Sequence, residues 1–152
     1  MRSSLLLVGA SLLLATAGSL VAKQPQQESQ QAPSSAPSLD YEFFRTQVEP
    51  IFLNKRPGHA RCVTCHAANN APLHLVPLSP GATTWNEEES RKNFELVKRV
   101  AIPGDLDSPL LIHPLAEAAG GDFFHGGGKH FNSQTDPEWL TLKAFVLGKK
   151  AE

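Results

Sequence analysis

The chain has 152 residues, 14 basic and 15 acidic, so its length suits one domain and it lacks the basic excess of a nucleic-acid-binding protein. It contains two cysteines and a single methionine, Met1. Two cysteines exclude a scaffold held by several disulfides, so the core must come from apolar packing or from a bound group.

Residues 1–22 have the three-part pattern of a secretory signal peptide. Arg2 precedes an apolar run, and small residues around Ala17 fit the cleavage rule. The stretch from Leu5 to Val21 carries no charge and reaches the lower end of spanning length, so a retained membrane anchor is the alternative. In both cases the rest of the chain is exported, which predicts a periplasmic or cell-envelope location.

Residues 23–38 are rich in Gln, Pro and Ser and are predicted to be a disordered linker. The folded domain is therefore expected over residues 39–148. Its first helix is predicted to follow a cap at Ser38 or Asp40, because apolar residues from Phe44 to Phe52 recur at helical spacing. Pro50 is expected to kink or loosen the last turn of this helix.

A second helix of about 14 residues is predicted after Thr84–Asn86, where Thr84 and Glu87 match the capping-box spacing. Pro103–Gly104 is expected to end it. A third, short helix is predicted from Leu110 to Ala118, with Pro109 at its first position.

The last helix is predicted to begin at Asp136–Pro137 and to end at Gly148. Alternating β-branched runs are missing, so the predicted fold class is all-α. Residues 67–85 and 119–135 are expected to be long loops, which in a small domain usually wrap something or are disordered. Short helices around a thin core would gain stability from a buried cofactor.

The most specific motif is CVTCH at residues 62–66. In a C-x-x-C-H segment the two thiols add across the vinyl groups of haem, and the histidine supplies an imidazole to the iron. One helical turn would place the sulfurs of Cys62 and Cys65 along one edge of the macrocycle, while the His66 ring reaches its centre. Export agrees with this interpretation, since haem is attached covalently outside the cytoplasm.

Two other interpretations of the cysteines are weaker. A thioredoxin-type disulfide between Cys62 and Cys65 expects a βαβ context, which the pattern lacks. A zinc site would require a second ligand pair at short spacing, and His59, His66 and His74 do not form one. Covalent haem is therefore the favoured interpretation.

An aromatic helix ending VEPIF precedes CVTCH, and the segments IPGDLDSPLLIHPL, GGDFFHGGGKHF and DPEWLTLKAFVLG follow it. With these segments, from Tyr41 to Gly148, the chain resembles the small single-haem c-type cytochrome domains of bacterial envelope proteins. The resemblance implies a cytochrome c-like helical domain with long haem-wrapping loops. It assigns Cys62 and Cys65 as thioether positions and His66 as the proximal iron ligand. It also implies that the first and last helices pack through aromatic residues, namely Phe43, Phe44, Trp139 and Phe145.

The chain departs from this family at the sixth iron ligand. Typical members use a methionine from the loop before the closing helix, and here no methionine follows Met1. The first candidate is His125, because the neighbouring glycines allow the backbone to approach the haem closely. His113 is the second candidate and His130 the third, and an open iron position is the remaining alternative.

The function expected from these features is one-electron transfer by a single covalent haem c with two histidine ligands. Without the methionine that raises the potential, a lower potential than that of a His/Met cytochrome is expected. The expected partners are transient redox proteins, with no nucleic acid, and an uncleaved N-terminal segment would add membrane association. The protein is therefore not expected to be an enzyme. The alternatives are a haem enzyme or gas sensor with an open sixth position, and a fixed haem relay in a larger respiratory or photosynthetic complex.

Overall fold

The computed structural model describes residues 36–68 and 72–152. The predicted signal peptide or anchor at 1–22 lies outside these residues, as does the linker up to residue 35. The described residues belong to one compact unit. None of the helices in the described part of the chain is long and apolar enough to span a membrane.

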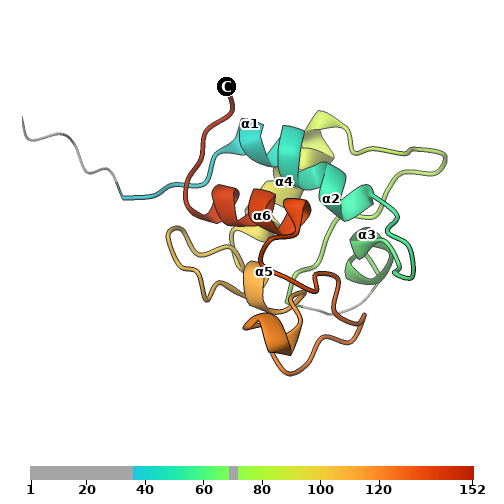
Figure 1. The fold of residues 1–152 in the computed structure, drawn as a ribbon. Coiled ribbons are helices and arrows are strands. Elements are labelled where there is room, and N and C mark those ends of the chain that lie inside the picture. The colour runs from blue at the N-terminus through green and yellow to red at the C-terminus, as the bar shows by residue number, and fades with distance from the viewer. Residues whose placement is uncertain (1–35, 69–71) are drawn as a thin grey trace, which may run out of the picture. The chain divides into compact units, whose positions relative to one another are not determined.

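The described residues form short helices joined by long loops (Figure 1). In chain order the elements are α1 (Tyr41–Phe43), a π-helical turn (Phe44–Val48), α2 (Glu49–Leu53), α3 (Cys62–His66), α4 (Glu87–Val97), α5 (Pro109–Ile112), a 3-10 turn (Glu117–Ala119) and α6 (Pro137–Val146). Across the described ranges the only β-type pairing is an isolated bridge between Leu115 and Phe131. The predicted all-α class is therefore confirmed.

The predicted first helix is divided into three parts. Asp40 is its N-cap, and its Oδ1 accepts a hydrogen bond from the backbone N–H of Phe43 at 2.8 Å. The π-helical turn, Phe44–Val48, comes directly before α2, whose first turn contains Pro50. Because proline donates no backbone hydrogen bond, the regular ladder cannot continue through Pro50, and the irregular turn lies just before it.

The middle helix, α4, begins where the sequence predicts, but its capping box is different. Asn86, rather than Thr84, is the N-cap, and it exchanges hydrogen bonds with Glu89. The residue between, Trp85, is buried and donates a hydrogen bond to the Val76 carbonyl at 2.8 Å. This hydrogen bond ties Trp85 to the preceding loop, so the helix begins only after Asn86. The prediction of a Thr84–Glu87 box was therefore wrong.

Helix α4 also ends earlier than predicted, at Val97. The carbonyl of Val100 accepts hydrogen bonds from the Leu110 N–H at 2.9 Å and from the Ser108 hydroxyl at 2.7 Å. The turn after α4 therefore pairs with the start of α5 instead of extending the helix.

Helix α5 covers only Pro109–Ile112, so the prediction of a helix to Ala118 was too long. Pro114 explains the early end, because a proline ring cannot continue the backbone hydrogen bonds of a helix. The chain forms a separate 3-10 turn at Glu117–Ala119.

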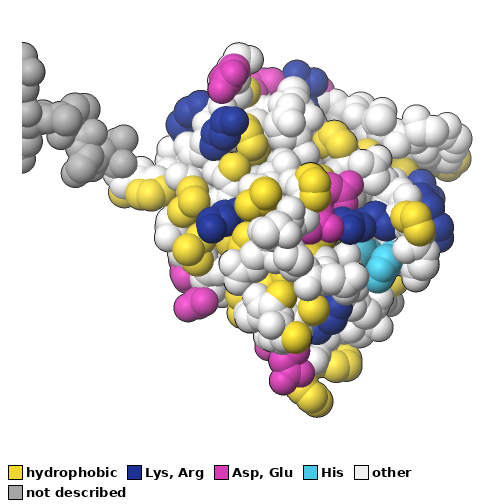
Figure 2. Space-filling view, in the orientation of Figure 1, with side chains coloured by type: hydrophobic (Ala, Val, Ile, Leu, Met, Phe, Trp, Pro, Cys, Tyr) yellow, Lys and Arg dark blue, Asp and Glu magenta, His cyan; other side chains and the backbone are white. Residues whose placement is uncertain are grey.

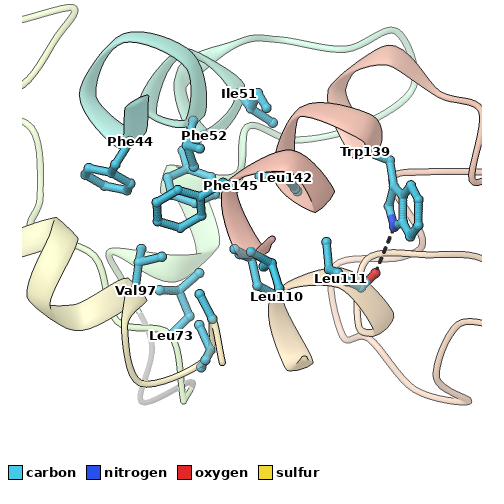
Figure 3. Close-up of a cluster of buried hydrophobic side chains, with 14 of the residues drawn as sticks. Phe44, Ile51, Phe52, Leu73, Val97, Leu110, Leu111, Trp139, Leu142 and Phe145 are labelled. Atoms are coloured by element: carbon cyan, nitrogen blue, oxygen red, sulfur yellow. Dashed lines mark hydrogen bonds between the residues drawn. The ribbon is translucent and has the colours of Figure 1, made fainter. Parts of the chain in front are cut away.

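The first and last helices pack against each other, as the sequence predicts. The ring centres of Phe44 and Phe145 lie 5.9 Å apart, and those of Phe43 and Phe145 lie 6.4 Å apart. Figure 3 shows Phe145 of α6 facing Phe44 and Phe52, with Trp139 farther along donating a hydrogen bond to the Leu111 carbonyl at 3.1 Å. Helix α6 thereby joins the N-terminal helices to α5.

The two expected loops are confirmed in the described part of the chain. No helix lies between residue 72 and Asn86, or between Gly120 and Asp136. In Figure 1 the C-terminal loop, drawn in orange, runs below α5 before the chain rises into α6. These loops and α3 surround the cavity described next.

Candidate functional site

A cavity of about 650 Å³ lies between α2, α3, α5 and the loop from Phe124 to Phe131. Its walls are mostly apolar and include Ile51, Phe52, Leu73, Val100, Leu110 and Leu142. Every residue that the sequence singled out for cofactor binding or iron ligation also lines it, namely Cys62, Cys65, His66, His113, His125 and His130. The fold thus brings residues from three separate segments to one apolar cavity of a size usual for cofactors, roughly 300–1,000 Å³.

Helix α3 consists of the motif alone, from Cys62 to His66. Both cysteines are free thiols and both face the cavity. Burial raises the pKa of the Cys62 thiol to about 11, because a thiolate there would lose its hydration. The Cys62 thiol is therefore protonated at neutral pH.

The backbone after α3 holds His66 at two points. Its ring Nδ1 lies 2.8 Å from the carbonyl oxygen of Leu73, and its own carbonyl accepts from the Leu75 N–H at 2.9 Å. Because a carbonyl oxygen only accepts hydrogen bonds, Nδ1 must carry the proton. The other nitrogen, Nε2, then keeps its lone pair, as a metal-ligating imidazole requires.

The same pattern recurs at His125 in the glycine-rich loop. Its ring Nδ1 lies 2.6 Å from the carbonyl oxygen of Gly128, and the Gly128 N–H donates to the His125 carbonyl at 2.9 Å. Gly128 has a φ of 78°, in the left-handed region that glycine adopts without strain. Burial lowers the pKa of His125, so its ring is neutral at pH 7 with the lone pair on Nε2.

His66 and His125 lie close together in the cavity. Their ring centres are 6.0 Å apart and their ring planes are inclined by 25°. Two imidazoles, each fixed through Nδ1 to a backbone carbonyl, therefore meet in one apolar cavity.

The other two candidates have different surroundings. Nδ1 of His113, at the C-terminal end of α5, lies against the Asp122 carboxylate. His130 is buried, and its Nε2 lies 2.9 Å from the carbonyl oxygen of Ala60. In His130 the nitrogen Nε2 is thus already bonded to a carbonyl oxygen, whereas in His113 it is Nδ1 that has a polar neighbour.

Two further histidines were considered from the sequence. The His59 ring lies 4.8 Å from that of His130, and His74 is exposed and does not line the cavity. In the part of the chain that the structure describes, no group of three or more His, Cys, Asp and Glu side chains is arranged to hold a metal ion.

The arrangement fits a planar metal macrocycle. The cavity is apolar, and two neighbouring imidazoles and two thiols on one helical turn line it, which are groups that could bind the metal and the edge of such a macrocycle. A bare ion would need more side-chain ligands than this pair, whereas a macrocycle brings four ligands of its own.

Sequence reasoning missed the backbone groups of the site. The carbonyls of Leu73 and Gly128 orient the two imidazoles, and the Ala60 carbonyl binds His130. In the sequence, only the three consecutive glycines after His125 indicated that backbone groups come close to the site. The direction of each carbonyl group depends on the folded path of the chain and cannot be predicted from local sequence.

Comparisons of the chain with protein-family models, with curated proteins and with solved structures found no match.

Proposed function

We propose that this protein is a one-electron carrier with one covalently attached haem c, held in a cytochrome c-like arrangement of helices. The observation that carries the proposal is the proximity of His66 and His125 in an apolar cavity that both motif cysteines line.

The separation of the two rings agrees with ligation of one metal ion. A metal–imidazole bond is about 2.0–2.1 Å long and a ring nitrogen lies about 1 Å from the ring centre, so two imidazoles on opposite sides of a metal have centres about 6 Å apart. The observed separation is 6.0 Å. Both rings also keep Nε2 free as the donor atom.

Cys62 and Cys65 would hold the haem. Each thiol would add across one vinyl group, so that a carbon–sulfur bond forms and the thiol hydrogen passes to the vinyl carbon. The protonated state of Cys62 at neutral pH agrees with a thiol that remains intact until this addition. The attachment supports the predicted export, since it takes place in the envelope.

Two protein ligands leave the iron no open position, so the chain's residues would bind no substrate there. His66 and His125, each fixed through Nδ1 to a backbone carbonyl, would hold the iron in one arrangement in both oxidation states, which would suit electron transfer rather than catalysis. Imidazole in place of methionine predicts a lower potential than that of a His/Met cytochrome.

The partners proposed here are redox proteins that dock briefly. The chain carries a net charge of only −1, and basic and acidic side chains are interspersed on the face shown in Figure 2. A mixed surface of this kind suits weak, short-lived contacts rather than a permanent interface. An uncleaved N-terminal segment would keep the carrier at the membrane.

The first test is the visible spectrum and intact mass of protein purified from its own envelope. We expect a low-spin spectrum in both oxidation states and a mass that exceeds the mature polypeptide by one haem. A colourless protein with the mass of the bare polypeptide would refute the proposal.

The second test replaces the sixth ligand. In His125→Ala the low-spin spectrum should be lost and the ferrous protein should bind carbon monoxide, whereas the exposed control His74→Ala should behave as the wild type. Loss of the low-spin spectrum in His113→Ala, but not in His125→Ala, would move the sixth ligand to α5. Tight carbon monoxide binding by the unmutated protein would favour the haem enzyme or sensor.

A further inference from the structure

His130 lies at the junction between the two halves of the candidate site. Its Nε2 lies 2.9 Å from the carbonyl oxygen of Ala60, two residues before Cys62. On its other side its ring centre is 6.1 Å from that of His125. Among the described residues, His130 makes the only side-chain hydrogen bond between the His125 loop, residues 122–131, and residues 54–61, which lead into α3.

The proton positions follow from these partners. A carbonyl oxygen accepts only, so Nε2 of His130 carries the proton and donates to Ala60. The Nδ1 of His130 lies farther from a carbonyl oxygen, that of Gly128 at 3.5 Å, whereas in His66 and His125 it is Nδ1 that makes the close contact, at 2.8 and 2.6 Å. His130 therefore serves as a hydrogen-bond donor, while the other two histidines keep Nε2 as a lone-pair donor.

The backbone at His130 is itself fixed. The N–H groups of His130 and Phe131 both donate to the carbonyl of Pro114, at 2.8 and 3.0 Å. The Phe131 carbonyl in turn accepts from the Ala116 N–H at 2.8 Å. The ring thus extends from a rigid backbone point, with only 7% of the residue exposed.

The base of the loop that carries His125 is held by Lys129, whose Nζ donates to the carbonyl oxygens of His113, at 3.0 Å, and of Asp122, whereas its tip is glycine-rich and exposed. Gly126, Gly127 and Gly128 follow the ligand candidate, and Phe123 and Phe124 before it are 84% and 72% exposed. A glycine-rich loop loses much conformational entropy when it is held in one conformation. A fixed donor at the end of the loop reduces the freedom that remains.

We propose that His130 is a positioning residue for His125: its bond to Ala60 fastens the His125 loop to the segment that leads into α3. The bond thereby sets the distance between His125 and His66. This inference rests on the proposed function, because His130 acts on the iron only through His125.

The expected consequence is a change in how firmly His125 holds the sixth position. Loss of a residue that orients a metal ligand typically lowers the metal affinity or the activity about 10–100-fold. Carbon monoxide must displace His125 to bind the ferrous iron. A loosened His125 would therefore lower the carbon monoxide concentration needed for half saturation by about tenfold or more.

The test compares three variants of the full-length, haem-loaded protein. His130→Leu removes the donor with a side chain of similar bulk, and His130→Gln retains an N–H donor. Trp139→Phe is the control, since it removes a different buried hydrogen bond, to Leu111, and Trp139 does not line the cavity.

We expect His130→Leu to reach half saturation with carbon monoxide at a concentration about tenfold lower than wild type, and His130→Gln to recover most of this difference. Trp139→Phe should lower the melting temperature but leave carbon monoxide binding unchanged. Hydrogen exchange should also be faster over residues 122–131 in His130→Leu than in Trp139→Phe.

An unchanged carbon monoxide affinity in His130→Leu would overturn the inference. An equal change in Trp139→Phe would overturn it too, since the effect would then be general destabilisation. If His130→Leu does not fold, a half-saturation concentration about tenfold below wild type in His130→Gln, which keeps an N–H donor, refutes it. A colourless wild type would instead refute the proposed function, and hydrogen exchange would still decide whether His130 fastens the loop.

Discussion

Arg56 and Asp136 join the segment that leads toward α3 to the first turn of α6. The Arg56 guanidinium donates to both carboxylate oxygens of Asp136, at 2.6 Å from Nη2 and 3.2 Å from Nη1. The same carboxylate caps α6 by accepting from the Glu138 N–H at 3.0 Å. One side chain thus links the approach to the cysteines with the helix that completes the core.

The charge of Asp136 should make the fold sensitive to acid. The hydrogen bond from Arg56 is the main reason why the pKa of Asp136 is lowered in the folded protein. Ionised Asp136 therefore stabilises the fold at pH values above its unfolded pKa of about 3.9, and this contribution is lost as the pH falls through the lower folded pKa. Asp136→Asn keeps a capping side chain but removes the charge.

We expect Asp136→Asn to lower the free energy of unfolding at pH 7 by about 1 kcal/mol, since the ion pair is partly exposed. The difference from wild type should shrink toward zero between pH 4 and pH 2, in urea titrations at each pH. A difference that is constant across this range would contradict the assignment. Arg45→Met, which breaks an exposed pair with Glu42, is the control and should cost less.

Glu49 is expected to destabilise the fold when it is ionised. It is 6% exposed, and its Oε1 has no hydrogen-bond partner among the described residues. Burial raises its pKa, and the nearby Ser90 hydroxyl offsets this only in part. The folded protein therefore favours the protonated form of Glu49. The fold is most stable below the pKa that Glu49 has in the unfolded chain, and it loses this stability as the pH rises through the higher pKa of the folded state.

Glu49→Gln should therefore be more stable than wild type at pH 7, by about 1 kcal/mol, the lower end of the usual cost of an unpaired buried polar group. The gain should diminish below about pH 4, where the wild-type carboxyl group is protonated in both states. Thermal unfolding at pH 7 and pH 3.5 measures both effects. A variant less stable than wild type at pH 7 would show that the carboxylate has a compensating partner.

Gly121 is required where the chain turns into the His125 loop. A Cβ atom there would collide with the carbonyl oxygen of Leu115 and would lie 2.9 Å from that of Ala116. We expect Gly121→Ala to cost about 2–3 kcal/mol, because backbone atoms must move to accept the methyl group. Gly127→Ala is the matched control, since its Cβ would meet only the His125 ring at 3.6 Å. Equal unfolding free energies for the two variants would disprove the close approach.

The Cys62 thiol should react slowly in the haem-free protein. With a pKa of about 11, its thiolate fraction at pH 8 is about two orders of magnitude below that of an ordinary cysteine with a pKa of about 8.5. Peptide mass spectrometry after timed iodoacetamide treatment would measure its alkylation. The same protein in urea supplies the control, in which Cys62 should react at the ordinary rate. Rapid labelling without urea would mean that the thiol is hydrated.

Local sequence signals were sufficient for much of the helical framework. The cap at Asp40, the start of α4 and the start of α6 at Pro137 follow from residues within one turn of each helix. Helix ends were predicted less well. Helix α4 ends early because Val100 pairs with α5, a contact that no local pattern shows. The early end of α5 could have been predicted from Pro114, which lies close after its last residue.

The sequence by itself determined which residues are the candidates for chemistry, because the C-x-x-C-H spacing brings two thiols and an imidazole together once the segment is helical, as it is in α3. It also excluded methionine as a partner for His66. Only the tertiary structure decided which distant histidine lies close to His66 and which donates to Ala60. The physical reason is that an imidazole can use either nitrogen, and the backbone carbonyl that meets the ring selects one of them.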